Sequence, residues 1–172
     1  MPEPSPFSDT YWVRPGSLLA GCYPFLKETE DGRHLRAMLR AGINEFVDLT
    51  REGELPAYDS VLKQLAGELG VQAAYQRFAI MDFGIPSAEL MGQILDTLNS
   101  KIAAGRKIYL HCWGGIGRTG TVVGCHLVRG GLSGASALAE IQRLRANVPD
   151  WYRSSPETAE QRDMVLNWGK PR

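Results

Sequence analysis

Residues 108–129 run from an apolar stretch through a glycine-rich turn into a stretch with helical apolar spacing. This segment constrains the fold more than any other part of the chain. The run Ile108-Tyr-Leu110 predicts a buried strand, and His111-Cys-Trp-Gly-Gly-Ile-Gly-Arg-Thr-Gly120 predicts a tight turn before a helix over 121–129. The first N–H groups of such a helix have no partner within the helix. The segment therefore predicts an anion-binding turn at the end of a strand.

Cys112 and Arg118 lie at the two ends of this turn, with five residues between them. Successive backbone N–H groups of a glycine-rich turn can point inward together and surround an anion. We expect the N–H groups of residues 113–118 to do so, and Arg118 to hold two oxygens of a tetrahedral oxyanion with its planar fork. The positive end of the helix and the guanidinium also favour the thiolate form of Cys112, which is the nucleophilic form. The N–H donors belong to Trp113, Gly114, Gly115, Ile116, Gly117 and Arg118.

The turn resembles the signature of the cysteine-based protein tyrosine phosphatases, His-Cys-x-x-Gly-x-x-Arg-[Ser/Thr]-Gly, at every defined position. The position of the turn two-thirds along a short chain resembles the dual-specificity type. Asp48-Leu-Thr50, and Ser155-Pro-Glu-Thr158 followed by Gln161, are similar to the kinase-associated phosphatase and its bacterial relatives. The resemblance implies hydrolysis of a phosphomonoester through a phosphocysteine on Cys112, without a metal or other cofactor.

A phosphocysteine reaction needs a general acid for the leaving oxygen, and Asp82 is our candidate. It follows a predicted strand over 71–80, lies 30 residues before Cys112 and opens the loop Asp82-Phe-Gly-Ile-Pro86. From the residues alone, Asp82 could equally be a solvated loop carboxylate without a catalytic role. The resemblance favours the role of general acid. The resemblance also implies that Thr119 donates a hydrogen bond to the Cys112 sulfur. We expect His111 to be buried and to shape the turn.

Apolar spacing elsewhere predicts strands alternating with helices, and therefore an α/β fold in which helices flank a central, mainly parallel sheet. Such folds bind ligands at the carboxyl ends of their strands, which is where the Cys112 turn would lie. The expected strands cover 12–13, 18–23, 43–49, 71–80 and 107–110. The expected helices cover 28–41, 58–69, 86–105 and 121–129, with one capped by Ser133 or Ser136 and a last one starting at Pro156.

The length of 172 residues suits one catalytic domain over 11–172, preceded by a mobile proline-rich tail over 1–10. The formal net charge of zero argues against a nucleic-acid partner. No apolar run is long enough to span a membrane, and the N-terminus lacks the layout of a signal peptide. Cys112 must stay reduced to react, so we expect a cytoplasmic protein, and we expect it to act as a monomer. Cys22 and Cys125 are expected in the core, the alternative being a disulfide that traps oxidised Cys112.

The turn also limits the substrate. It contains no lysine, whereas phosphatases of this type that act on polyphosphorylated inositols carry lysines there. Arg51, Phe83 and Trp113 are expected at the rim, where they would suit a phosphotyrosine ring, although Trp113 could equally turn into the core. The expected partner is therefore a phosphorylated protein. The alternatives are a phosphatase of RNA 5′-phosphates or phosphoinositides, or a phosphate-binding module without activity. Gln161 either faces the site or merely begins the last helix.

Overall fold

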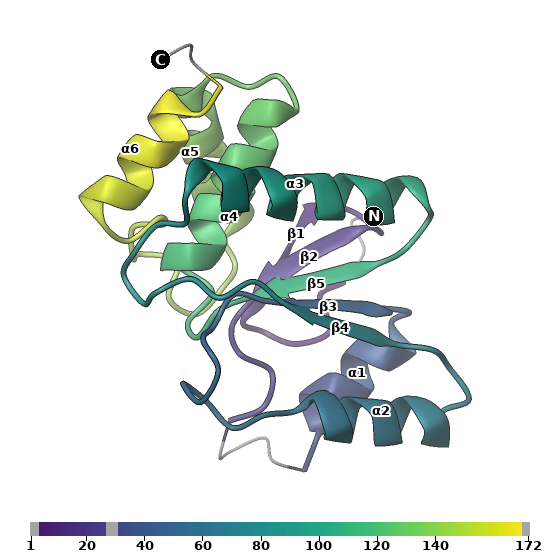
Figure 1. Ribbon diagram of the computed structural model, residues 1–172. Coiled ribbons are helices and arrows are strands. Elements are labelled where there is room, and N and C mark those ends of the chain that lie inside the picture. Colours follow the sequence, from purple (N-terminus) through teal and green to yellow (C-terminus); the bar gives the residue numbers. More distant parts are fainter. Residues whose placement is uncertain (1–3, 27–30, 170–172) are drawn as a thin grey trace.

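The computed structural model describes residues 4–26 and 31–169 as a five-stranded sheet with helices on both faces (Figure 1). The strand order is β1-β2-β5-β3-β4, and every neighbouring pair except β1–β2 is parallel. This confirms the predicted α/β fold with a mainly parallel central sheet. The strands are β1 Thr10–Arg14, β2 Leu18–Gly21, β3 Glu45–Asp48, β4 Ala74–Arg77 and β5 Ile108–His111.

In the described part of the chain, six helices cover the two faces of the sheet. In Figure 1, α1 and α2 lie on one face, and α3, α4, α5 and α6 lie on the other. Because side chains alternate along a strand, Tyr109 of β5 packs in the core under α1 and α2, while Ile108 and Leu110 pack in the core under α3 to α6. The helices are α1 Arg33–Arg40, α2 Asp59–Glu68, α3 Ala88–Ala103, α4 Gly117–Arg129, α5 Gly134–Leu144 and α6 Ala159–Asn167.

Side-chain caps set where several helices begin. Ser87 caps α3, close to the start predicted for a helix over 86–105, and Ser133 rather than Ser136 caps α5. The prediction that the last helix starts at Pro156 was wrong. Thr158 caps α6 and forms a capping box with Gln161, which places the first helical residue at Ala159.

Two other predicted boundaries were too wide. The strand expected over 71–80 is only Ala74–Arg77 in β4, an edge strand with a partner on one side. The chain still runs along β3 beyond that point, because the N–H groups of Phe78 and Ile80 donate to Asp48 and Leu49. The helix expected over 28–41 is described from Arg33 onward as α1, and residues 27–30 lie outside the described part of the chain.

The segment before β1 contacts the domain where it is described. Phe7 stacks on His34 with ring centroids 3.9 Å apart, and the hydroxyl of Thr10 donates to the Phe7 carbonyl. Residues 1–3 of the proposed tail are outside the described part of the chain. Within the described residues, no helix combines the length and apolar character that crossing a membrane requires.

The register of the sheet places the ends of its central strands side by side. His111, the last residue of β5, is paired with Gly21 at the end of β2 and with Asp48 at the end of β3. Cys112 therefore leaves the sheet from its middle strand, flanked by the chain on both sides. This edge is the carboxyl end of four parallel strands, where this class of fold binds ligands.

Candidate active site

The turn between β5 and α4 is held from two sides. The Tyr23 N–H donates to the Trp113 carbonyl over 2.7 Å, and the Ser155 hydroxyl donates to the Ile116 carbonyl over 2.7 Å. Gly115 has a left-handed φ of +71°, and its backbone lies directly against Gly21. The turn is therefore fixed in shape by contacts with β2 and with the segment before α6, as a preorganised anion site requires.

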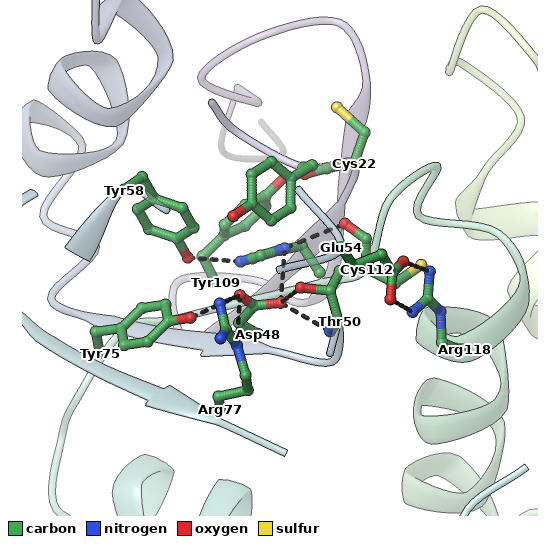
Figure 2. Close-up of polar contacts among 12 residues, drawn as sticks. Cys22, Asp48, Thr50, Glu54, Tyr58, Tyr75, Arg77, Tyr109, Cys112 and Arg118 are labelled. Atoms are coloured by element: carbon green, nitrogen blue, oxygen red, sulfur yellow. Dashed lines mark hydrogen bonds and ion pairs between the residues drawn. The ribbon is translucent and has the colours of Figure 1, made fainter. Parts of the chain in front are cut away.

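Arg118, in the first turn of α4, is almost fully buried, and most of its donors are engaged. Its Nη1 and Nη2 donate to the two carboxylate oxygens of Glu54 over 2.9 and 2.7 Å (Figure 2). Nη1 also donates to the Ile80 carbonyl over 3.1 Å, and Nη2 lies 3.0 Å from Oδ1 of Asp82. Among the described residues, none accepts from Nε of Arg118. The guanidinium thus holds both carboxylates next to the thiol of Cys112.

Glu54 is a site residue that sequence reasoning missed. It belongs to the acidic, proline-containing loop that follows Asp48-Leu-Thr50. That loop is part of the resemblance to the kinase-associated phosphatase, but the resemblance assigned Glu54 no role. Partial burial by itself raises the pKa of Glu54, but the hydrogen bonds from Arg118 and the N–H of Arg51 outweigh it and lower that pKa. Glu54 is therefore held as a carboxylate that orients the fork of Arg118.

A cavity of about 300 Å³ opens over the turn, and it brings together the predicted nucleophile, oxyanion-binding arginine and acid. Cys112 is buried on its floor, and Asp82 lines its wall. Phe83 and Trp113 line it with 59% and 52% of their surfaces exposed, so Trp113 does not turn into the core. Arg51 is not among the lining residues. The full lining is Asp82, Phe83, Cys112, Trp113, Gly114, Ile116, Gly117, Arg118, Arg153 and Glu157.

His111 is fully buried beneath the turn, as predicted from its position. Its Nδ1 lies 3.2 Å from the Cys112 carbonyl, and its Nε2 lies 2.6 Å from the Tyr58 hydroxyl. Burial lowers the pKa of His111, so the ring is neutral. We assign the proton to Nδ1, which donates to the carbonyl, while Nε2 accepts from Tyr58. His111 thereby ties the Cys112 backbone to the core.

Asp48 supports this arrangement from below. Its buried carboxylate accepts from the N–H and hydroxyl of Thr50 over 2.8 and 2.7 Å, and from the Tyr75 hydroxyl over 2.7 Å. Arg77 forms an ion pair with it at 3.2 Å. Burial by itself raises the pKa of Asp48, but the hydrogen bonds from Tyr75 and Thr50 outweigh it and lower the pKa. Asp48 is therefore a structural anchor behind the site and has no access to the cavity.

The sequence left the roles of Thr119 and Gln161 open. The Thr119 hydroxyl is buried and has no hydrogen-bond partner among the described residues, so its bond to the Cys112 sulfur stays a prediction. Gln161 begins α6 by accepting from the N–H groups of Glu157 and Thr158, and it also donates to the Gly84 carbonyl over 3.0 Å. It therefore joins α6 to the loop that carries Asp82.

The other two cysteines differ from Cys112 in environment. Burial raises the pKa of both Cys22 and Cys125 to about 12, so both are protonated at neutral pH. Cys125, in α4, lies in the hydrophobic core, as expected. Cys22 is half-buried, and its sulfur points away from that of Cys112 (Figure 2). The disulfide with Cys112 remains an untested alternative.

A protein-family comparison matches residues 8–163 to a model described as a Swiss Army Knife protein, DSP-PTPase phosphatase domain. A mouse protein called protein tyrosine phosphatase domain-containing protein 1 is 28% identical over 68% of the chain and 16% of its own length. An uncharacterized protein of Methanocaldococcus jannaschii is 34% identical over 54% of the chain and 58% of its own length. The chain thus spans only part of these relatives.

Solved structures share the fold over nearly the whole chain. The active form of Tk-PTP is 26% identical with a TM-score of 0.68, and the match covers 92% of this chain and 94% of that one. Kinase associated phosphatase is 20% identical with a TM-score of 0.69, covering 87% and 84%. PTPMT1 in complex with PI(5)P is 18% identical with a TM-score of 0.68, covering 93% and 94%.

Proposed function

The chain belongs to the DSP-PTPase family of phosphatase domains matched over residues 8–163, and from this premise we propose that it dephosphorylates proteins through a phosphocysteine on Cys112. The observation that carries the proposal is the juxtaposition of three side chains in one cavity. Cys112 lies on the floor, and Arg118 and Asp82 meet beside it at 3.0 Å. A nucleophile, an oxyanion-binding fork and an acid are the groups that this reaction needs.

In the first step, the Cys112 thiolate attacks phosphorus, the P–S bond forms and the P–O bond to the leaving group breaks. Asp82 gives its proton to the departing oxygen. In the second step, a water oxygen attacks phosphorus, the P–S bond breaks, and Asp82 takes the proton of that water. Residues 113–118 hold the three equatorial oxygens with their N–H groups, and Arg118 adds two charged donors.

The contacts of Arg118 couple substrate binding to the release of the acid. Nε is the donor that no described residue uses, and Nη2 is shared between Glu54 and Asp82. A phosphate that binds Nε and Nη2 together displaces Asp82 from Nη2, while Glu54 can keep its hold on the other edge. The displaced carboxylate then takes up a proton from solvent and lies next to the leaving oxygen, to which it gives that proton.

The rim supports an aromatic phosphomonoester, with phosphotyrosine as the first candidate. Phe83 and Trp113 present exposed rings at the mouth of the cavity, and such rings pack well against a phenyl ring. The turn has no lysine, and Arg153, the other basic residue of the lining, is paired with Glu157 at 2.6 Å. This arrangement favours a single phosphate over a polyphosphorylated inositol. The need for a reduced Cys112 also favours a reducing compartment such as the cytoplasm.

The test is hydrolysis of p-nitrophenyl phosphate in EDTA by the wild type and by Cys112→Ser, with and without vanadate. Vanadate-sensitive turnover that disappears in the variant supports the cysteine mechanism. A panel of phosphotyrosine and phosphoserine peptides, a phosphoinositide and a 5′-phosphorylated RNA then ranks the substrates. If the folded wild type shows no turnover but binds vanadate tightly, the proposed enzymatic activity would be overturned in favour of a phosphate-binding module.

A further inference from the structure

A groove of about 950 Å³ lies beside the catalytic cavity and is lined by residues at the start of α3 and along α6. It is larger than the cavity over Cys112, and the proposed chemistry uses none of its side chains. Its apolar surface comes from Ile85, Met164 and Trp168, of which Ile85 is 44% exposed. A groove of this size is large enough for several side chains of an extended peptide.

The charged side chains among the described lining residues of the groove all have one sign. Glu89, Glu160 and Asp163 line it, and no lysine or arginine is among its described lining residues. The chain as a whole carries no net charge, so this acidity is local. The carboxyl end of α6, the negative end of its dipole, also faces the groove through Asn167 and Gly169. The positive end of α3 is offset by Glu89 in its own first turn. The groove therefore attracts cations.

The combination of an acidic rim with an apolar floor selects a particular type of side chain. Lysine and arginine lay their methylene stems on apolar surface and keep their charges at the rim. A cation can also stack on an indole face such as that of Trp168. A basic segment that contains an aliphatic residue is thus complementary to both components of the groove.

The groove and the catalytic cavity are lined by neighbouring residues of the same two segments. Asp82 and Phe83 line the cavity, while Ile85 and Pro86 of the same loop line the groove. On the opposite side, Glu157 lines the cavity and Glu160, in the first turn of α6, lines the groove. The hydrogen bond from Gln161 to the Gly84 carbonyl joins the two walls. A peptide bound by its phosphate over Cys112 reaches the groove by crossing residues 83–86.

From this we infer that the groove binds a basic, partly aliphatic segment of the phosphoprotein substrate, next to the phosphorylated residue in sequence. The inference rests on the proposed function, because it assumes a phosphoprotein substrate. It adds that substrates are selected by positive charge outside the phosphate pocket.

The test uses phosphotyrosine peptides with Lys, Arg and Leu on one side or the other, and matched peptides with Gln and Ser instead. The double variant Glu160→Gln, Asp163→Asn should lose about fivefold in kcat/KM on the basic peptide, and the loss should shrink at high salt. Turnover of p-nitrophenyl phosphate should stay unchanged, because this small ester does not reach the groove. The matched control, Asp59→Asn with Glu68→Gln on α2, removes two carboxylates from another helix and should have no effect.

Binding separates this inference from the proposed function. Cys112→Ser saturated with vanadate is titrated with the labelled, unphosphorylated basic peptide. Binding that weakens in the groove variant supports the groove even if no phosphoprotein is hydrolysed. Equal behaviour of basic and neutral peptides, or of groove and control variants, overturns the inference. Tighter peptide binding by the double variant Lys170→Gln, Arg172→Gln would also overturn it, because the chain's own basic end would then be the occupant of the groove. Concentration-dependent dimerisation that is lost in the groove variant would overturn it as well, because a second copy of the chain would then be the occupant.

Discussion

Glu54 and Arg118 form a two-pronged ion pair, Nη2 to Oε1 at 2.7 Å and Nη1 to Oε2 at 2.9 Å, within the candidate active site. The two residues are 64 positions apart in the sequence. Because the guanidinium of Arg118 is almost fully buried, this pair sets the direction in which its remaining donors point. Glu54 is therefore a positioning residue for the proposed phosphate site.

Replacing Glu54 with Gln should lower kcat/KM for p-nitrophenyl phosphate by roughly tenfold to hundredfold, since hydrogen bonds to charged groups contribute about 1.5–3 kcal/mol. The variant keeps the size of the side chain and loses the charge that holds Arg118. Steady-state kinetics measure the effect, and Glu52→Gln, an exposed residue of the same loop, is the control. A gain in phosphate affinity would instead mean that Glu54 competes with the substrate.

Replacing Asp82 with Asn should lower kcat by about 10²- to 10⁴-fold for phenyl phosphate, which is the range of general-acid catalysis. The loss should be smaller for p-nitrophenyl phosphate, because p-nitrophenolate leaves without protonation. Comparing the two substrates in both proteins measures this difference. Equal losses on the two substrates would show that Asp82 acts on binding and not as the acid.

Gly115→Ala should disable the turn, whereas Gly114→Ala should be tolerated. At Gly115 the φ is +71°, and an added Cβ would lie 2.6 Å from the Gly21 oxygen and 2.8 Å from the Cys22 nitrogen. At Gly114 the nearest atom is a side-chain carbon of Ile116, 3.6 Å away. We expect at least a roughly hundredfold loss of kcat/KM for Gly115→Ala, the cost of misplacing an oxyanion donor. Comparable activity in both variants would contradict the role of the Gly21 contact.

Phe83→Asn should stabilise the protein and weaken its selectivity for aryl esters. Phe83 is the one non-glycine residue with positive φ in the described chain, at 59°, and Asn accepts this conformation more readily. We expect the free energy of unfolding to rise by about 1 kcal/mol. The kcat/KM ratio of aryl to alkyl phosphates should fall severalfold as the ring is lost. An unchanged ratio would exclude Phe83 from substrate recognition.

Stability should fall as the pH drops from about 7.5 to 5. Burial lowers the pKa of His34, His111 and His126 below the ordinary 6.5. As the pH falls, the histidines of the unfolded chain therefore bind protons before those of the folded chain. The stabilisation from the neutral histidines is complete above pH 6.5 and is lost as the pH falls below that value. Below 3.8 the lowered pKa of Asp48 adds a further loss in the same direction. Urea unfolding across this range measures the slope, which should be shallower in His111→Asn.

Local chemistry explains what could be predicted from the sequence. The apolar run over 108–110, the glycines of the turn and the apolar spacing after it predict a strand, a turn and a helix through interactions between near neighbours. The predicted helix start at 121 was wrong, because α4 already begins at Gly117. Asp82 was a candidate because the carboxyl ends of parallel strands meet at one edge of a sheet, and the family resemblance favoured it over a solvated loop carboxylate. These rules were enough for the α/β fold, and together with the resemblance they selected the three residues that line one cavity.

Tertiary structure alone decided which distant side chains complete the site. Glu54 meets Arg118, and Gln161 holds the Gly84 carbonyl from 77 positions away, because the sheet order brings separate loops to one edge. Trp113 lies at the rim because its carbonyl is tied to Tyr23 while its side chain stays outside the core. The start of α6 likewise follows from the Thr158–Gln161 capping box and not from the proline before it. Such contacts depend on the packing of whole elements, and no spacing rule within a single segment encodes them.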